Sequence, residues 1–220
     1  MKFLFSSIGK KIQIATSGVL LCVFLVFHLG NNMVLFAGEE WFNAMVSKLE
    51  LIKPAIRIME FGLLGLLIMH IGNALYVTYQ NKQSQSQKYQ VNSSETSSLN
   101  SRTMAVSGVI VLLFFILHLY FIWGSYNFGE NINLHDEAFN VLIQNKFGYL
   151  GHTFTASLYI ISILLLAFHL KHGFQSALKT FGVTKESRLS ILYHMAVVFW
   201  GIIPFGFIMI ILCIQFKVIQ

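Results

Sequence analysis

The chain has 220 residues, of which 55% are hydrophobic and only 11% are charged, and its formal net charge is +6. A soluble domain carries roughly 25% charged residues, so the long apolar segments are expected to face membrane lipid. Lys and Arg stand at segment ends and form no basic stripe interleaved with aromatic residues. The composition therefore predicts an all-α integral membrane protein and argues against a nucleic-acid partner.

Five apolar segments are long enough to span a membrane, and they cover residues 12–36, 55–79, 103–126, 148–176 and 190–215. Each exceeds the ~20 residues that a helix needs to cross the hydrocarbon layer. The two-residue alternation of a lipid-facing barrel is absent, which leaves helices as the spanning form. Pro54 suits a helix start, and Pro204 is expected to kink the fifth helix. We predict one domain, residues 1–220, built as a bundle of five transmembrane helices.

Three connections have a character of their own. Residues 37–53 carry apolar side chains at helical spacing, which predicts a short helix in the membrane interface. Residues 80–102 are rich in Gln, Ser and Asn and predict a polar cytoplasmic loop. Residues 127–147 contain NLHDEAFNVLIQ, which allows a second short surface helix.

The cations predict the orientation of the helices. With the N-terminus inside, the inner side collects ten cations: Lys2, Lys10, Lys11, Lys82, Lys88, Arg102, Lys171, Lys179, Lys185 and Arg188. The outer side then holds five: Lys48, Lys53, Arg57, Lys146 and Lys217. The positive-inside rule therefore favours a cytoplasmic N-terminus and an outer C-terminus.

Five of the eight histidines fall well within the predicted helices, whereas His135, His152 and His194 lie in a loop or near a helix end. An ionisable residue at membrane depth marks a functional site by default. His28 and His118 each precede the outer end of their helix by about eight residues, which is roughly 12 Å. His70 and His169 lie on helices that run the other way, at a similar depth from the inner surface. The four residues therefore form two pairs at two levels.

Two imidazoles that face each other at one depth are typical of a six-coordinate b-type haem. Two levels on the order of 10–15 Å apart, judged from helix rise, would allow electron transfer between two such haems. Gly18 and Gly108 precede His28 and His118 by ten residues, and Gly62, Gly65 and Gly72 flank His70. These glycines would let a flat macrocycle approach a helix, or they serve helix packing alone.

The alternatives are hydrogen-bonded core histidines, a proton path, or a non-haem metal. A non-haem metal needs its ligands clustered with carboxylates or thiolates, which two separate levels disfavour. His172 stands three residues beyond His169, and spacing alone does not choose between them, although depth favours His169. Nearer the inner boundary, His172 and Lys171 would contact haem propionates, as would Thr16, Ser17 and Arg102 if the bundle brings them close.

The order of the five helices, the segment KKIQIATSG…FLVFHLGNN and the later FHLKHGFQSALKTFG together resemble one family. It is the single-subunit dihaem cytochrome b anchor of succinate dehydrogenase and fumarate reductase, respiratory complex II. The resemblance covers nearly the whole chain. Its most specific motif is His169 followed four residues later by Gly173. It implies that His169 rather than His172 is a ligand, and that two haem b groups bind His28 with His118 and His70 with His169.

The resemblance implies an electron-transfer subunit of the bacterial inner membrane. An iron–sulfur subunit, which carries a flavoprotein, would dock on the cytosolic face, and a quinone, usually menaquinone, would react in the membrane. The chain would not act on succinate by itself. Such complexes can form a dimer of heterotrimers.

Lys48-Leu49-Glu50 matches a K-x-E context that serves the quinone site in one branch of the family. Glu50 would then exchange protons with a quinol at the outer interface, or it belongs to a solvated helix face. Glu60 is a second acidic candidate, unless it pairs with Arg57 at i,i+3 spacing. Ala167 replaces the glutamate that carries protons in that branch, so its proton path is not expected here.

Two rival functions stay open at this stage. The first is a dihaem cytochrome b of another membrane oxidoreductase, such as a ferric reductase. The second is a channel or transporter that uses its histidines for protons.

Overall fold

The structure, a computed structural model, describes residues 3–84, 99–128, 137–183 and 186–220. Within these ranges every regular element is helical. The elements are α1 (Ser7–Met33), a 3-10 turn (Val34–Ala37), α2 (Glu39–Leu51), α3 (Lys53–Ser84), α4 (Leu99–His118), a π-helical turn η2 (Leu119–Gly124), α5 (Ser125–Phe128), α6 (Ala138–Ile143), α7 (Thr153–Thr180), α8 (Glu186–Val197), a second π-helical turn η3 (Val198–Ile202) and α9 (Ile203–Gln215).

Five helical stretches in the described part of the chain are long and apolar enough to cross a membrane. They are Ser7–Ala37, Lys53–Gln83, Val106–Phe128, Thr153–Thr180 and Ser190–Gln215. They coincide with the five predicted segments, so the prediction of an all-α, multi-pass membrane protein is confirmed at that level. Large apolar side chains point outward from these helices, as for Phe27 and Phe61, which are 68% and 69% exposed. An apolar surface of this kind suits contact with lipid.

Two predicted boundaries are wrong. The fourth span begins at Thr153 rather than at residue 148, because Gly148 has a φ of +100° and the His152 side chain caps the helix by accepting from the Thr155 amide. The predicted loop at 80–102 is shorter, since residues 80–84 and 99–102 are helical. Gln80 and Gln83 extend α3 by donating to the hydroxyls of Tyr76 and Tyr79 at 2.8 and 2.6 Å. Residues 85–98 lie outside the described residues.

Two short helices, α2 and α6, pack against each other between the long ones. The rings of Phe42 and Phe139 lie 6.2 Å apart, and the Phe139 amide donates to the side chain of Asn43 at 3.0 Å. The helix predicted within 37–53 is thus confirmed as α2. The one allowed within 127–147 is confirmed for Ala138–Ile143, and residues 129–136 lie outside the description.

The helical hydrogen-bond pattern changes next to Pro204, where a kink is predicted. Proline lacks an amide donor and clashes with the carbonyl four residues earlier. The π-helical turn η3 directly precedes α9, in which Pro204 occupies the first turn. A second π-helical turn, η2, directly follows His118. Such turns are frequent at functional sites.

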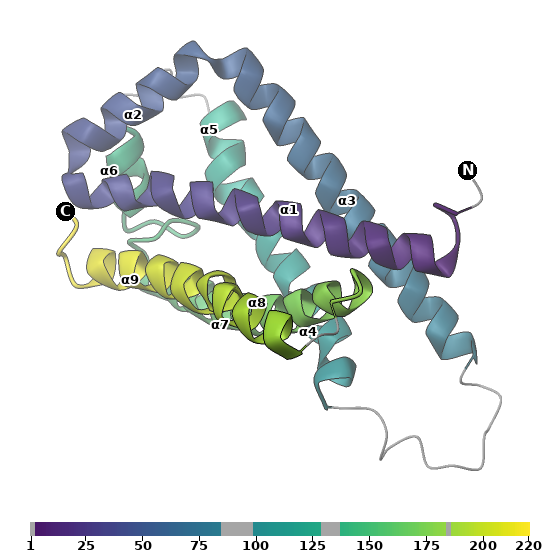
Figure 1. Cartoon of the computed structure of the whole chain (residues 1–220). Helices are drawn as coiled ribbons and strands as arrows, with labels where there is room; N and C mark the ends of the chain where they lie inside the picture. Colours follow the sequence, from purple (N-terminus) through teal and green to yellow (C-terminus); the bar gives the residue numbers. More distant parts are fainter. Residues whose placement is uncertain (1–2, 85–98, 129–136, 184–185) are drawn as a thin grey trace.

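The long helices pack around α7, which contacts α1, α4 and α9, while α1 also packs against α3. Figure 1 shows the two chain ends at opposite ends of the molecule, with α2 and α6 at the end that holds the C-terminus. We call these ends the N-terminal side and the C-terminal side. A core cluster that includes Leu35, Phe139 and Ile210 joins the helices at the C-terminal side.

Candidate functional site

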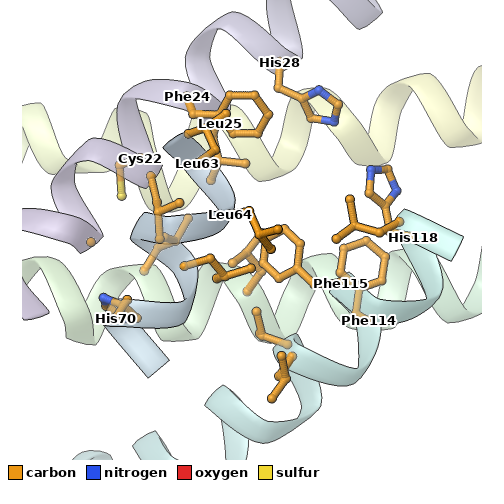
Figure 2. A pocket seen from close by; sticks show the side chains of 18 of the residues that line it. Cys22, Phe24, Leu25, His28, Leu63, Leu64, His70, Phe114, Phe115 and His118 are labelled. Atoms are coloured by element: carbon orange, nitrogen blue, oxygen red, sulfur yellow. The ribbon is translucent and has the colours of Figure 1, made fainter. Parts of the chain in front are cut away.

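A cavity of about 1940 Å³ runs between the helices. It is larger than the ~300–1,000 Å³ of an ordinary small-molecule site. Its lining includes all four predicted ligands, His28, His70, His118 and His169. Between His70 and the other labelled histidines, Figure 2 shows apolar side chains from α1, α3 and α4. The cavity therefore has an apolar middle, with histidines at separate places along it.

His28 on α1 and His118 at the end of α4 point toward each other (Figure 2). Their ring centroids are 5.9 Å apart, with an angle of 81° between the ring planes. With a metal-to-nitrogen bond of about 2 Å on each side, two axial imidazoles on one metal have ring centres on the order of 6 Å apart. The observed separation fits that arrangement.

Aromatic side chains surround this pair. Phe24 stacks on His28 at 5.3 Å, and Phe207 approaches His28 from α9 at 5.4 Å. The Tyr159 hydroxyl lies 3.4 Å from His118 Nδ1, and Tyr159 is itself buried. The sequence reading did not select Tyr159, which reaches His118 from α7.

His70 and His169 occupy matching positions on the other helices. His70 Nδ1 lies 3.1 Å from the Ser17 hydroxyl on α1, and His169 Nδ1 lies 3.4 Å from the Ser107 hydroxyl on α4. A Cβ on Gly18 would stand 3.3 Å from the His70 ring, and one on Gly108 would stand 3.5 Å from the His169 ring. The two glycines therefore leave room for the two rings. By contrast, a Cβ on Gly62, Gly65 or Gly72 would meet nothing within 4 Å.

His28 and His70 lie at two levels along α1. His70 contacts α1 at Gly18, whereas His28 follows Gly18 by ten residues. At 1.5 Å per residue this separates the levels by about 15 Å. His172 also lines the cavity, so cavity lining alone does not distinguish it from His169.

The residues predicted to contact propionates differ in their burial and in their contacts. Ser17 is fully buried behind His70, and the Lys171 ammonium lies 4.8 Å from the centroid of the Trp200 ring. Thr16 is exposed, and the side chain of Arg102 lies outside the description. At the N-terminal side the cavity is lined by three cations, Lys11, Lys82 and Lys179. Their positions in the sequence, at the N-terminal-side ends of α1, α3 and α7, could have marked them as candidates for contact with propionates.

Polar side chains from α2, α3, η2 and α5 gather in the cavity lining at the C-terminal side. We call this group the α2–α3 polar cluster: Glu50, Lys53, Arg57, Glu60, Trp123, Tyr126 and Asn127. Glu50 forms an ion pair with Lys53 and is hydrogen-bonded to the Tyr126 hydroxyl. Arg57 pairs with Glu60 at 2.6 Å, bonds Asn127 and lies 5.6 Å from the Trp123 ring centroid.

Glu50 and Glu60, predicted from the sequence as two separate candidates, both belong to this cluster. The predicted pairing of Glu60 with Arg57 is observed. The sequence reading missed Tyr126 and Asn127. The run Ser125-Tyr126-Asn127 at the end of an apolar segment could have pointed to them.

Within the described residues, no three or more His, Cys, Asp or Glu side chains are grouped as a metal site would need. The cavity histidines come instead from four different long helices, and His28 and His118 face each other. Comparison of the chain with protein-family models, with curated proteins and with solved structures finds no match.

Proposed function

We propose that this chain is the haem-bearing membrane anchor of a succinate:quinone oxidoreductase, passing electrons between an iron–sulfur subunit and a membrane quinone. The observation that carries the proposal is that the cavity histidines lie at two levels, with His28 and His118 facing each other at one of them. The ring centroids of His28 and His118 are 5.9 Å apart. The rings of His70 and His169 lie against Gly18 and Gly108, which precede His28 and His118 by ten residues on the same two helices.

Two haem b groups fit the residues that are present. His28 and His118 would hold one through their imidazoles, and His70 and His169 would hold the other. A bound haem supplies one-electron chemistry that the side chains lack. The apolar lining between the levels excludes water, and the cations Lys11, Lys82 and Lys179 offer partners for carboxylates at the N-terminal side.

The α2–α3 polar cluster is the proposed quinone site. A quinone exchanges two protons with each two electrons, so its site needs groups that accept and donate protons. Glu50 and Tyr126 form such a hydrogen-bonded pair in the cavity lining. Arg57, held by Glu60 and Asn127, adds a fixed positive charge beside them.

The partners and the orientation follow from the charge distribution and from the family resemblance. The excess of cations at the N-terminal side favours a cytosolic location for that end. The iron–sulfur subunit and its flavoprotein would dock there, and quinone, menaquinone in the usual case, would react toward the other side. The bacterial inner membrane is the proposed location.

The decisive experiment purifies the complex under mild detergent and records haem absorbance after succinate is added. We expect succinate to reduce the haem, because the assembled subunits connect the flavoprotein to this chain. Reduction by dithionite but not by succinate would reject the assignment to this oxidoreductase. It would leave a dihaem cytochrome b of another oxidoreductase, or a ferric reductase. Absence of any Soret band would favour a proton channel or transporter instead.

A series of histidine variants tests the ligand pairs. His70→Ala or His169→Ala should remove one spectral component and keep the other, and His28→Ala or His118→Ala should do the reverse. His194→Ala is the matched control, because His194 is exposed on α8 and bonds only the Ser190 carbonyl within the described contacts. Two full haem equivalents in any ligand variant would overturn the pairing.

A further inference from the structure

Two serines lie next to His70 and His169, which we call the N-terminal-side histidines. The Ser17 hydroxyl on α1 lies 3.1 Å from His70 Nδ1, and the Ser107 hydroxyl on α4 lies 3.4 Å from His169 Nδ1. Ser17 is fully buried. Neither serine belongs to the cavity lining, so each acts on the cavity only through its histidine.

Each serine has carbonyls of its own helix within donating distance of its hydroxyl. The Ser17 hydroxyl lies 2.7 Å from the Gln13 carbonyl and 3.1 Å from the Ile14 carbonyl, and the Ser107 hydroxyl lies 3.0 Å from the Met104 carbonyl. A hydroxyl has one proton, and a carbonyl can only accept. When that proton is donated to a helix carbonyl, the serine presents a lone pair to its histidine, and Nδ1 is then the donor.

A second acceptor strengthens this assignment at His70. The Ile14 carbonyl lies 3.1 Å from His70 Nδ1, and a bond to it also requires a proton on Nδ1. A neutral imidazole that carries its proton on Nδ1 has its lone pair on Nε2. The nitrogen that remains for a metal is therefore Nε2 at both positions.

The same local sequence creates this arrangement twice. Ser17-Gly18 on α1 is followed ten residues after the glycine by His28, and Ser107-Gly108 on α4 is followed at the same distance by His118. The glycine admits the ring of the neighbouring helix, and the serine accepts from its Nδ1. Each of these two helices thus supplies a ligand to one pair and an acceptor to the other.

We propose that Ser17 and Ser107 are positioning residues that hold His70 and His169 in the Nδ1-protonated tautomer, with Nε2 free to bind iron. The iron-binding part rests on the proposed function, whereas the tautomer does not. An acceptor on Nδ1–H increases the electron donation of an axial imidazole and favours the oxidised metal. The serines should therefore lower the reduction potential of the haem held by that pair.

The first test needs no haem. Haem-free protein labelled with ¹⁵N-histidine is reconstituted in bilayers and examined by solid-state NMR, with His169 assigned by the signal lost in His169→Asn. We expect an Nδ1–H tautomer in the unmodified chain and a partial shift to Nε2–H in Ser107→Ala. Ser157→Ala is the control, since Ser157 is an exposed residue of α7 that donates to the Thr153 carbonyl. An Nε2–H tautomer in the unmodified protein would overturn the proposal.

The second test measures the reduction potentials of the haem-loaded complex. Ser107→Ala should raise the potential of the component that His169→Ala removes, leave the other component unchanged, and weaken haem binding there roughly 10-fold. Ser17→Ala should have a smaller effect, because the Ile14 carbonyl remains. Ser107→Thr, which keeps the hydroxyl, should restore the original potential.

The outcomes distinguish a failure of the positioning role of the serines from a failure of the proposed haem-binding function. An unchanged potential in Ser107→Ala, or a haem loss that Ser107→Thr does not repair, would reject the positioning role. A chain that binds no haem would reject the proposed function, and the NMR measurement would still decide the tautomer.

Discussion

Glu50 shares its carboxylate between two partners at the cavity wall. Lys53 follows it by three residues, while Tyr126 reaches it from α5. A carboxylate held in this way can take a proton from a substrate hydroxyl without leaving its place, and the tyrosine can relay that proton. The chemistry expected of this pair is proton exchange, not haem binding.

Glu50→Gln should therefore slow quinone turnover by roughly 10²-fold, at the lower end of general acid–base contributions, with haem content unchanged. Tyr126→Phe should act on the same step, so the double variant should lose less than the product of the single effects. Glu39→Gln is the matched control, because Glu39 lies on the same helix but bonds Asn140 at 2.5 Å outside the cavity. Turnover unaffected by Glu50→Gln would exclude the role.

Gly18 gives a second prediction at the scale of single residues. A side chain there would press on the His70 ring, because even a Cβ comes within 3.3 Å of it. Gly18→Val should remove the spectral component that His70→Ala removes and keep the other. Gly30→Val on the same helix meets nothing within 4 Å at its Cβ and should keep both components. Loss of both components in Gly18→Val alone would indicate a folding defect rather than a local displacement.

At the scale of the elements, close approach of α1 and α9 depends on Gly206. A Cβ at this position would stand 2.9 Å from the end of the Leu29 side chain. Small residues at such contacts let membrane helices pack closely. Leu29 directly follows His28 in the sequence. The contact of Leu29 with Gly206 therefore helps to hold His28 opposite His118.

Gly206→Leu should destabilise the protein by about 1–3 kcal/mol, the usual cost of overpacking. The measurement is the midpoint of heat denaturation in detergent, which should fall relative to the unmodified chain. Gly30→Leu, which faces open space, should leave that midpoint nearly unchanged. Equal midpoints for both variants would show that the α1–α9 contact is not tight.

The elements also show what a sequence can and cannot reveal. The five candidate spans follow from counting apolar residues, so they could be predicted. The contacts of Ser107 with His169 and of Tyr126 with Glu50 depend on how each helix is rotated about its axis, which counting does not give. The end of α3 was misplaced because polar residues continue a helix where side-chain bonds such as Gln80 to Tyr76 support it.

The whole molecule is organised by an odd number of candidate spans. Five such helices occur among the described residues, and the chain ends lie at opposite ends of the molecule, as in Figure 1. Of the cations at the N-terminal side, Lys11, Lys82 and Lys179 line the cavity there. The proposed orientation and the proposed docking side of a partner both rest on this asymmetry.

Fusions of reporter proteins test this orientation. Alkaline phosphatase fused after Gln220 should be active, because the enzyme folds only outside the cytoplasm, whereas a fluorescent protein fused there should be dark. After truncation at Thr180, the end of the fourth span, the results should be reversed. An active phosphatase at Thr180 together with an inactive one at Gln220 would place the N-terminus outside.

The central claim is that the paired histidines of one chain hold two haems. The most direct measurement is the haem b content of the purified protein, determined as the pyridine haemochrome and divided by the protein concentration from amino-acid analysis. We predict two haem b groups per chain, falling to one in His70→Ala and remaining two in His194→Ala. A content of one or none in the unmodified, folded protein would contradict the account.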